Sequence, residues 1–385
     1  MTDAHIGHLI KNVSQISAES MSPLSSQPLV TLVVVSYNQD AYIEDTILSV
    51  LNQDYEPIEL IVIDGGSTDG TLEILRKYDA DPRFRLISEP DDGPQDGFNK
   101  GLGLARGELI GFQTGGDTYR LGAFAEAVQE FATDANLAMV SGRVQEIDED
   151  SNPTGISWAG SKRVALVEGY VQVIDEHGNP TGIAWDVTKR KSDYSVDEIV
   201  NFNNYPAGQA SFFRRKLTVA IGGFGHNVKW LPTFFFLHYM LEASRLGARS
   251  LRVPQHWANY RRHSDPLSHT LHYDLEVGLV SRQERCLACK EISDEYMDFL
   301  TTEQVRELRR SAYLDELRYR VGTLNQIIPA IPAILGYFRF GGKPGDGNLQ
   351  PRAKGMLAYI GSFVIGQILH IARKRPSSSH PMRND

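Results

Sequence analysis

The sequence predicts an α/β fold in which helices flank a mostly parallel β-sheet. Short apolar runs alternate with amphipathic stretches from Val30 onward, an order of elements that is typical of β-α-β units. Four of these runs occupy residues 31–37, 60–63, 84–87 and 108–112. Because the carboxyl ends of parallel strands meet at one edge of a sheet, the loops after these runs are expected to form a ligand site.

The stretches between the apolar runs carry helix signals. After the first run, Ile43, Ile47 and Leu51 repeat at the spacing of one helical face. Asp69 lies in the turn GGSTDG, where it can cap the next helix. A further helix is expected around Phe98, after the third run.

Composition narrows the functional class. The chain has 385 residues, 41% hydrophobic and 23% charged, which is typical of a folded protein with one large domain and a smaller appendage. The formal net charge of -9 argues against a nucleic-acid groove, since such grooves rely on clustered Lys and Arg. Cys286 and Cys289 are too few for a disulfide framework, so we expect helical cysteines in a reducing, cytoplasmic compartment.

The middle of the chain contains an internal repeat. Residues 138–158 and 165–185 are identical at 14 of 21 positions. Each copy predicts a strand, a turn at Ser-Asn-Pro or Gly-Asn-Pro and a return strand, which together make a β-hairpin. This duplicated hairpin, residues 138–185, is expected to extend the sheet or to cover the site.

Changes in composition predict three segments. Residues 1–28 are expected to be a polar tail without a secretory signal, residues 29–270 the α/β domain and residues 271–385 a helical region. Residues 356–372 are apolar with basic flanks and fall just below the length of a membrane span. They predict a helix at the membrane interface, or else a helix buried against the α/β domain.

Several motifs in combination resemble the inverting family 2 glycosyltransferases, which have the GT-A fold. The resemblance rests on VVVSYN, LIVIDGGSTDGT, ISEPDDGPQDGFNKGL and GELIGFQTGGDTYRLGA, and it extends more weakly through QASFFRRK, IGGFG and NYRRHSDPLS. It covers roughly residues 30–270. It implies a GT-A mixed sheet that binds a nucleotide-sugar donor.

The resemblance implies a nucleotide pocket at the ends of the first strands. Tyr37 can stack on a base, and Asp64 can accept the imide N–H of uracil or thymine, although Asp64 could instead cap the turn after it. Lys100 can meet a phosphate or be a solvated lysine. The expected nucleotide-binding residues are Ser36, Tyr37, Asn38, Asp64, Gly65, Asp91, Asp96 and Lys100.

The expected metal site departs from the family pattern. Relatives carry an acidic cluster after the fourth strand, where carboxylates hold a divalent cation that neutralises the leaving diphosphate. Here the segment is Gln-Thr-Gly-Gly-Asp, residues 113–117. Gly116 stands where an acid is expected, so Asp117 is the one acid of the segment. One carboxylate, two phosphate oxygens and waters can still hold a cation, so Asp117 is the expected ligand of Mg²⁺ or Mn²⁺.

The catalytic base is a second departure. The family places acids before a helix that ends in a Leu-Gly-Ala turn, and counting back from residues 246–248 puts Phe236 and His238 at those positions. His238 is a candidate general base, and Glu242 one helical turn later is a rival. A third interpretation is that His238 only packs beside a core of aromatic residues. Counting forward instead from Gly223 and Phe224 places Thr233 and Phe235 at the two acidic positions, so this alignment gives no acid either.

A segment near the end of the domain resembles one that contacts the diphosphate in the family. It is YRRH, residues 260–263, in which Arg262 and His263 are the expected ligands because arginine binds phosphate oxygens bidentately. Surface arginines on an edge strand are the alternative.

The expected function is inverting transfer of a sugar from a UDP- or dTDP-linked donor to a saccharide or lipid-linked acceptor. The resemblance and the apolar C-terminal segment suggest bacterial surface polysaccharide or lipopolysaccharide synthesis, at the cytoplasmic face of the plasma membrane with peripheral association. No nucleic-acid partner is expected, and the oligomeric state is not indicated. A catalytically weakened homologue that binds nucleotide or a partner, and a nucleotidyltransferase that releases pyrophosphate, are the alternatives.

Overall fold

The computed structural model describes 18–159, 162–167, 170–174, 180–185, 191–200, 206, 208–224, 233–262 and 288–318. The chain divides into two compact units, residues 1–308 and 309–385. The sheet and the candidate site belong to the first unit. Residues 356–372, Cys286 and His263 lie outside the described residues.

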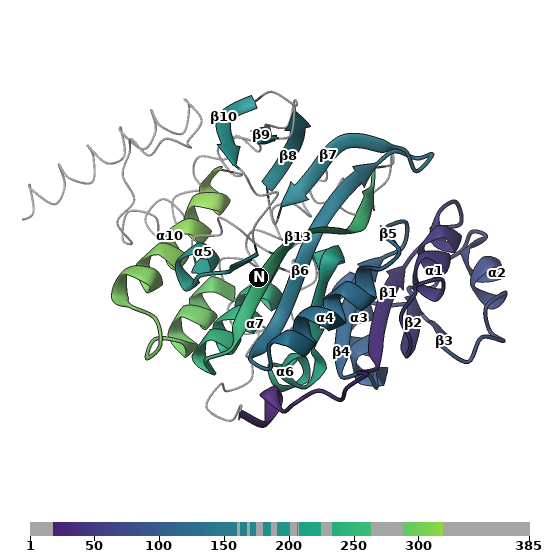
Figure 1. Ribbon diagram of the computed structural model, residues 1–385, viewed down its shortest axis with the longest axis horizontal. Helices are drawn as coiled ribbons and strands as arrows, with labels where there is room; N and C mark the ends of the chain where they lie inside the picture. The colour runs from purple at the N-terminus through teal and green to yellow at the C-terminus, as the bar shows by residue number, and fades with distance from the viewer. Residues whose placement is uncertain are drawn as a thin grey trace, which may run out of the picture. The chain divides into compact units, whose positions relative to one another are not determined.

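The predicted parallel strands are confirmed. Strands β1 (Val30–Ser36), β2 (Ile58–Asp64), β3 (Phe84–Ser88) and β4 (Leu109–Thr114) stand in the order β4-β1-β2-β3, and each neighbouring pair is parallel (Figure 1). Between them run α1 (Ile43–Leu51), α2 (Thr71–Arg76) and α3 (Pro94–Leu104). These strands are nearly continuous apolar runs because helices cover both faces of the sheet.

The sheet continues beyond β4 with strands that return to the same direction. Strand β12 (Ser211–Arg214) is antiparallel to both β4 and β6 (Leu137–Ile147), and β13 (Arg249–Arg261) is parallel to β6. Strands β6 and β13 therefore run in the same direction as β1 to β4. The carboxyl ends of these six strands consequently lie at one edge of the sheet.

Two short strands, β5 (Thr118–Tyr119) and β11 (Ser192–Asp193), pair with β13. Further helices of the first unit are η3 (Ala18–Met21), α4 (Ala123–Thr133), α5 (Val196–Val200), η4 (Gly208–Ala210), α6 (Arg215–Ala220) and α7 (Thr233–Arg245). Helix α10 (Thr302–Arg318) spans the division between the two units. Aromatic rings of β4, β12, α3 and α7 pack together on one face, including Phe98, Phe112, Phe213 and Phe235. Among the described residues, no helix has the length and apolar character needed to cross a membrane.

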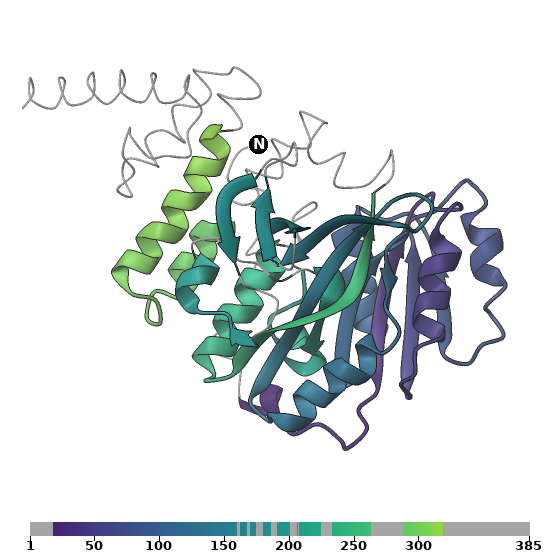
Figure 2. The same ribbon diagram turned by 45° about the horizontal axis from the view of Figure 1, so that its top comes forward.

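The repeat extends the sheet from the carboxyl half of β6, which pairs with β7 beyond the residues that pair with β12. Strands β7 (Pro153–Ala159), β8 (Lys162–Val167), β9 (Tyr170–Ile174) and β10 (Pro180–Trp185) follow in antiparallel order (Figures 1 and 2). The first copy is one hairpin, β6 and β7. In the second copy the part that matches β6 is divided between β8 and β9, which pair with each other.

The two copies differ because their surroundings differ. Strand β6 is held straight by β12 on one side and β13 on the other. Its Gly142 lies against Trp257 so closely that an added Cβ would be 2.6 Å from the indole ring. The equivalent strands of the second copy pair with neither β12 nor β13.

Candidate active site

The loops at the carboxyl ends of the parallel strands bring distant residues together. Asp64 ends β2 in register with Ser36 at the end of β1, and the loop of residues 114–117 follows β4 beside them. On the far side of β12, residues 148–152 follow β6, and Arg261 ends β13 in register with Ile147. This edge carries most of the predicted site residues.

The loop after β1 presents one aromatic ring to solvent. Tyr37 is 59% exposed, so its ring is available to stack on a base. Asn38 has a φ of 51° and joins the loops after β1 and β2: its amide donates to Ser67 Oγ (2.8 Å) and its Oδ1 accepts from the Thr68 amide (2.9 Å). Ser36 is buried, and its Oγ has no hydrogen-bond partner among the residues that the structure describes.

The Asp64 carboxylate is fully buried beneath the loop that follows it. Oδ2 accepts from the amides of Gly66 (3.1 Å) and Ser67 (3.0 Å) and from the Ser88 hydroxyl (2.8 Å), and Oδ1 accepts from the Ser67 hydroxyl. The geometry corresponds to the turn-capping alternative. The structure does not support direct contact of Asp64 with a base, because four protein donors occupy its oxygens.

Asp91 packs against the backbone of Gly65. A Cβ on Gly65 would lie 2.9 Å from Asp91 Oδ2, so a side chain at this position would displace the Asp91 carboxylate. Asp91 Oδ1 accepts from the Gly93 amide at 2.9 Å. Burial raises the pKa of Asp91, the nearby Lys100 opposes the rise, and the negative charges of Asp96 and Asp64 add to it.

Lys100 is engaged by acidic neighbours. Its Nζ lies 2.9 Å from Glu89 and 3.2 Å from Asp96, and it also donates to the Pro90 carbonyl (3.3 Å). The hydrogen bond to Glu89 is the main cause of the raised pKa of Lys100. These contacts tie the loop after β3 to α3, and they do not support the expected phosphate contact. Asp96 keeps 38% of its side chain exposed.

Asp117 is buried and hydrogen-bonded on both oxygens. Oδ1 accepts from the Arg261 amide (2.9 Å) and Oδ2 from the Thr114 hydroxyl (2.9 Å), with Gln209 as a further donor. Burial raises the pKa of Asp117 to about 6, although these hydrogen bonds oppose the rise.

A resident divalent cation does not fit this donor set. In the part of the chain that the structure describes, no three Asp, Glu, His or Cys side chains gather around a common point. Asp117 is the one acid of its loop, and protein donors already occupy its carboxylate oxygens.

Arg261, the last residue of β13, belongs to the YRRH segment but differs from its neighbour in exposure. It is 1% exposed, whereas the side chain of its neighbour Arg262 is 65% exposed and lies 3.7 Å from Glu146. Successive residues of a strand face opposite sides, so the pair Arg-Arg at a strand end was the signal that one of them is buried. Arg262 stays available for a diphosphate, and His263 lies outside the described residues.

The structure gives no support to His238 as a base. It is fully buried in α7, its ring packs 5.8 Å from that of Tyr296, and burial lowers its pKa to about 3. The next residue, Tyr239, donates its hydroxyl to the carbonyl of Ala138, near the amino end of β6. His238 therefore lies inside the core, toward the opposite edge of the sheet from Asp117.

Glu242 is also placed away from the candidate site. It is fully buried, forms an ion pair with Arg245 (2.5 Å) and accepts from the Tyr296 hydroxyl (3.1 Å). The interpretation that α7 contributes core residues here is the one that the structure favours.

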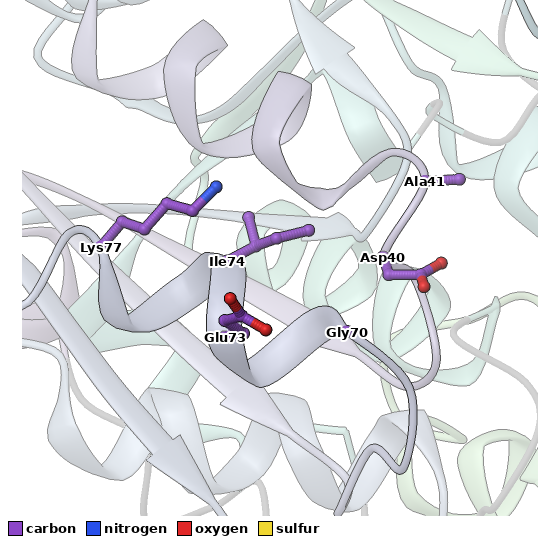
Figure 3. A pocket seen from close by; sticks show the side chains of 6 residues that line it. All are labelled: Asp40, Ala41, Gly70, Glu73, Ile74 and Lys77. Atoms are coloured by element: carbon purple, nitrogen blue, oxygen red, sulfur yellow. The ribbon is translucent and has the colours of Figure 1, made fainter.

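A pocket of about 440 Å³ lies beside the loops after β1 and β2. Asp40 and Ala41 line it from the first loop, and Gly70, Glu73, Ile74 and Lys77 line it from α2 and its ends (Figure 3). None of the expected nucleotide-binding residues lines this pocket. It is therefore separate from the site described above.

Comparison with known proteins identifies related sequences. Residues 31–183 match the family model described as Glycosyl transferase family 2. The chain is 31% identical over 140 residues to a hyaluronan synthase of Pasteurella multocida, covering 36% of this chain and 14% of that protein. It is 35% identical over 138 residues to a chondroitin synthase of Escherichia coli, covering 35% of this chain and 20% of that protein.

A shorter relative is the putative teichuronic acid biosynthesis glycosyltransferase TuaG of Bacillus subtilis, 38% identical over 96 residues, or 24% of this chain and 38% of that protein. Among solved structures, the fold is similar to that of S. aureus TarS 1-349 in complex with UDP-GlcNAc. The TM-score is 0.56 at 15% identity, with 86% of each chain covered.

Proposed function

We propose that this chain, whose residues 31–183 match the family model described as Glycosyl transferase family 2, transfers a sugar from a uridine or thymidine diphosphate sugar to a hydroxyl of a saccharide or lipid-linked acceptor, with inversion. The observation that carries the proposal is the shared edge of six parallel strand ends. It combines an exposed aromatic ring at Tyr37 with an exposed arginine at Arg262.

Charge divides this edge into two parts. The β2 and β3 side holds Asp64, Asp91 and Asp96 around one lysine that is already ion-paired. Carboxylates accept hydrogen bonds from ribose hydroxyls but repel phosphate, so we assign the base and ribose to this side, with Tyr37 stacked on the base. We assign the diphosphate to the β13 side, where Arg262 and, by resemblance, His263 can neutralise the leaving group.

The relatives support a polysaccharide as the acceptor class. Two are named as synthases of hyaluronan and chondroitin and a third as a teichuronic acid biosynthesis glycosyltransferase. The aligned region is at most 38% of each of these proteins, so their acceptors are a guide to the first assays. Residues 356–372 would hold the chain at the inner face of the plasma membrane, which co-sedimentation of the full chain with anionic vesicles tests.

The proposal is tested by following the full chain with UDP-GlcNAc, other UDP-sugars and dTDP-sugars in the presence of oligosaccharide acceptors. Release of a nucleoside diphosphate, together with a lengthened acceptor by mass spectrometry, is the expected result, in parallel reactions with Mn²⁺, Mg²⁺ or EDTA. Pyrophosphate release would instead indicate a nucleotidyltransferase. Nucleotide binding without turnover on any acceptor would indicate a catalytically weakened homologue.

A matched pair of variants tests the nucleotide assignment. Tyr37→Phe keeps the ring and should bind UDP like the parent chain. Tyr37→Ala removes the stacking surface, which is worth about 1–3 kcal/mol per base, so UDP affinity should fall by about 5- to 150-fold. Equal affinities of the two variants would remove Tyr37 from the site.

A further inference from the structure

Arg261 binds two successive residues of the loop that follows β4. Its main-chain amide donates to Asp117 Oδ1 at 2.9 Å, and its Nε donates to the carbonyl of Gly116 at 3.0 Å. The two bonds come from one residue and end on two successive residues of the loop. Arg261 therefore holds the Gly116–Asp117 segment together with Thr46 of α1, whose hydroxyl accepts from the Gly116 amide (2.9 Å) and donates to the Asp117 carbonyl (2.8 Å).

The rest of the guanidinium binds two other segments. Nη1 donates to the Glu149 carbonyl (2.9 Å) and to Ser151 Oγ (3.0 Å), in the turn between β6 and β7. Nη2 forms an ion pair with Asp45 of α1 (2.8 Å), and the group lies 4.9 Å from the ring centre of Tyr42. Arg261 thus joins α1, the loop after β4 and the first hairpin of the repeat.

We propose that Arg261 is a positioning residue of the transfer reaction, which holds the 114–117 loop and the 148–151 turn together as one rigid wall of the site. This inference rests on the proposed function. It assigns different tasks to two adjacent arginines: Arg262 is exposed and can bind the diphosphate, whereas Arg261 has donors committed to the protein and is 1% exposed.

The chemistry of the contacts explains why arginine is needed. The guanidinium is a planar fork with five donors, which can reach several carbonyl oxygens at fixed angles. Lysine carries the same charge at a single point and cannot bind Gly116, Glu149 and Asp45 at once. Asp45, the carboxylate that pairs with the guanidinium, is 52% exposed, so the carbonyl contacts supply most of the directional hold on the guanidinium.

Arg214 provides a matched control. It is 2% exposed, and it donates to the carbonyls of Leu137 (2.7 Å), Ala135 (2.8 Å) and Ser22 (2.8 Å). Leu137 begins β6, so Arg214 is a buried arginine of the same kind at the opposite edge of the sheet. Loss of either arginine should lower stability, but only Arg261 contacts the site.

The test compares Arg261→Lys with Arg214→Lys in the full chain. Misplacement of a site by about 1 Å can cost on the order of 100-fold in rate, so Arg261→Lys should lower kcat by that order while donor KM and UDP affinity stay within about threefold. Arg214→Lys should leave kcat of the folded protein unchanged. If Arg261 binds the donor, UDP affinity falls with kcat, and if its role is only structural, the two variants behave alike; either result overturns the proposal.

Two further measurements keep the outcome readable. Ser151 has a φ of 69°, so Ser151→Gly relieves backbone strain while it removes one hydrogen-bond partner of Arg261. This variant should be stable and should have a severalfold lower kcat, which gives a test even where Arg261→Lys does not fold. Hydrogen exchange should rise in residues 114–117 and 148–151 in Arg261→Lys and not in Arg214→Lys. Unchanged exchange overturns the inference without any activity assay, whereas an inactive parent chain counts against the proposed function instead.

Discussion

The main-chain amide of Arg261 donates a hydrogen bond of 2.9 Å to Oδ1 of Asp117, across 144 residues of sequence. The Thr114 hydroxyl donates to the other oxygen at 2.9 Å. The acid expected to bind a cation is therefore a buried acceptor that joins β4 to β13. Substitutions at this edge of the sheet are therefore expected to change the stability of the chain.

Asp117→Asn should alter the pH dependence of stability. Burial raises the pKa of Asp117 from 3.8 to about 6, so between these pH values the folded chain binds a proton that the unfolded chain releases. The free energy of unfolding must then fall as pH rises through this window, by up to about 3 kcal/mol from this group, and the loss persists at higher pH. Urea unfolding of both proteins at pH 4 and pH 7 checks this: parallel profiles would contradict it.

Gly116→Asp should destabilise the chain and not create a cation site. Gly116 has a φ of 101°, a conformation that costs a residue with a Cβ about 1–3 kcal/mol. The control is Gly103→Ala in α3, where nothing lies within 4 Å of an added Cβ, so stability should rise by up to about 1 kcal/mol. Thermal unfolding with and without Mn²⁺ measures both effects. An increase in stability with Mn²⁺ in Gly116→Asp alone would show that a site had formed.

His238→Asn should retain most of the transfer activity. A general base contributes about 10²- to 10⁴-fold to a rate, whereas His238 is fully buried and burial lowers its pKa to about 3. We expect kcat per folded molecule to change less than tenfold, and the same for Glu242→Gln. A fall of 100-fold or more in either variant, with circular dichroism unchanged, would restore that residue as the base.

Asp64→Asn should affect folding more than base selection. The substitution replaces one acceptor by an NH₂ group that faces the donors of Gly66, Ser67 and Ser88, so stability should fall by about 2–4 kcal/mol. The exposed Asp92→Asn is the control and should be nearly neutral. Calorimetry with UDP and CDP decides the role. An unchanged ratio of the two affinities fits a turn cap, and a ratio that collapses toward one would mean that Asp64 recognises the imide.

Lys100→Met should leave phosphate recognition unchanged. Lys100 lies in ion pairs with Glu89 and Asp96 on a partly exposed surface, which contribute about 0–1 kcal/mol. The ratio of UDP to uridine affinity should match that of the parent chain, while Arg262→Met should reduce it. A selective loss of UDP binding in Lys100→Met would place the diphosphate on the β3 side and reverse our assignment.

The sequence determined the parallel strands, their helices and the edge where their loops meet. Alternation of apolar runs with helical spacing is a local property, and the strand direction then places Tyr37, Asp64 and Asp117 at one edge without knowledge of contacts. The motifs were sufficient to predict the family. The hairpin of the first repeat copy was also readable, since a turn tripeptide lies between two short strands.

The tertiary structure decided which side chains are available at that edge. Whether an acid is free or bonded depends in part on partners far away in sequence: Asp117 accepts from Arg261, and Asp64 accepts from Ser88. The same holds for the two repeat copies, where pairing with β12 and β13 keeps one strand straight while the other is divided. Local sequence patterns determine which segments become strands, because the patterns reflect burial along one element. The order of the strands in the sheet determines which side chains lie next to each other, and therefore which acids and bases are free to contact a ligand.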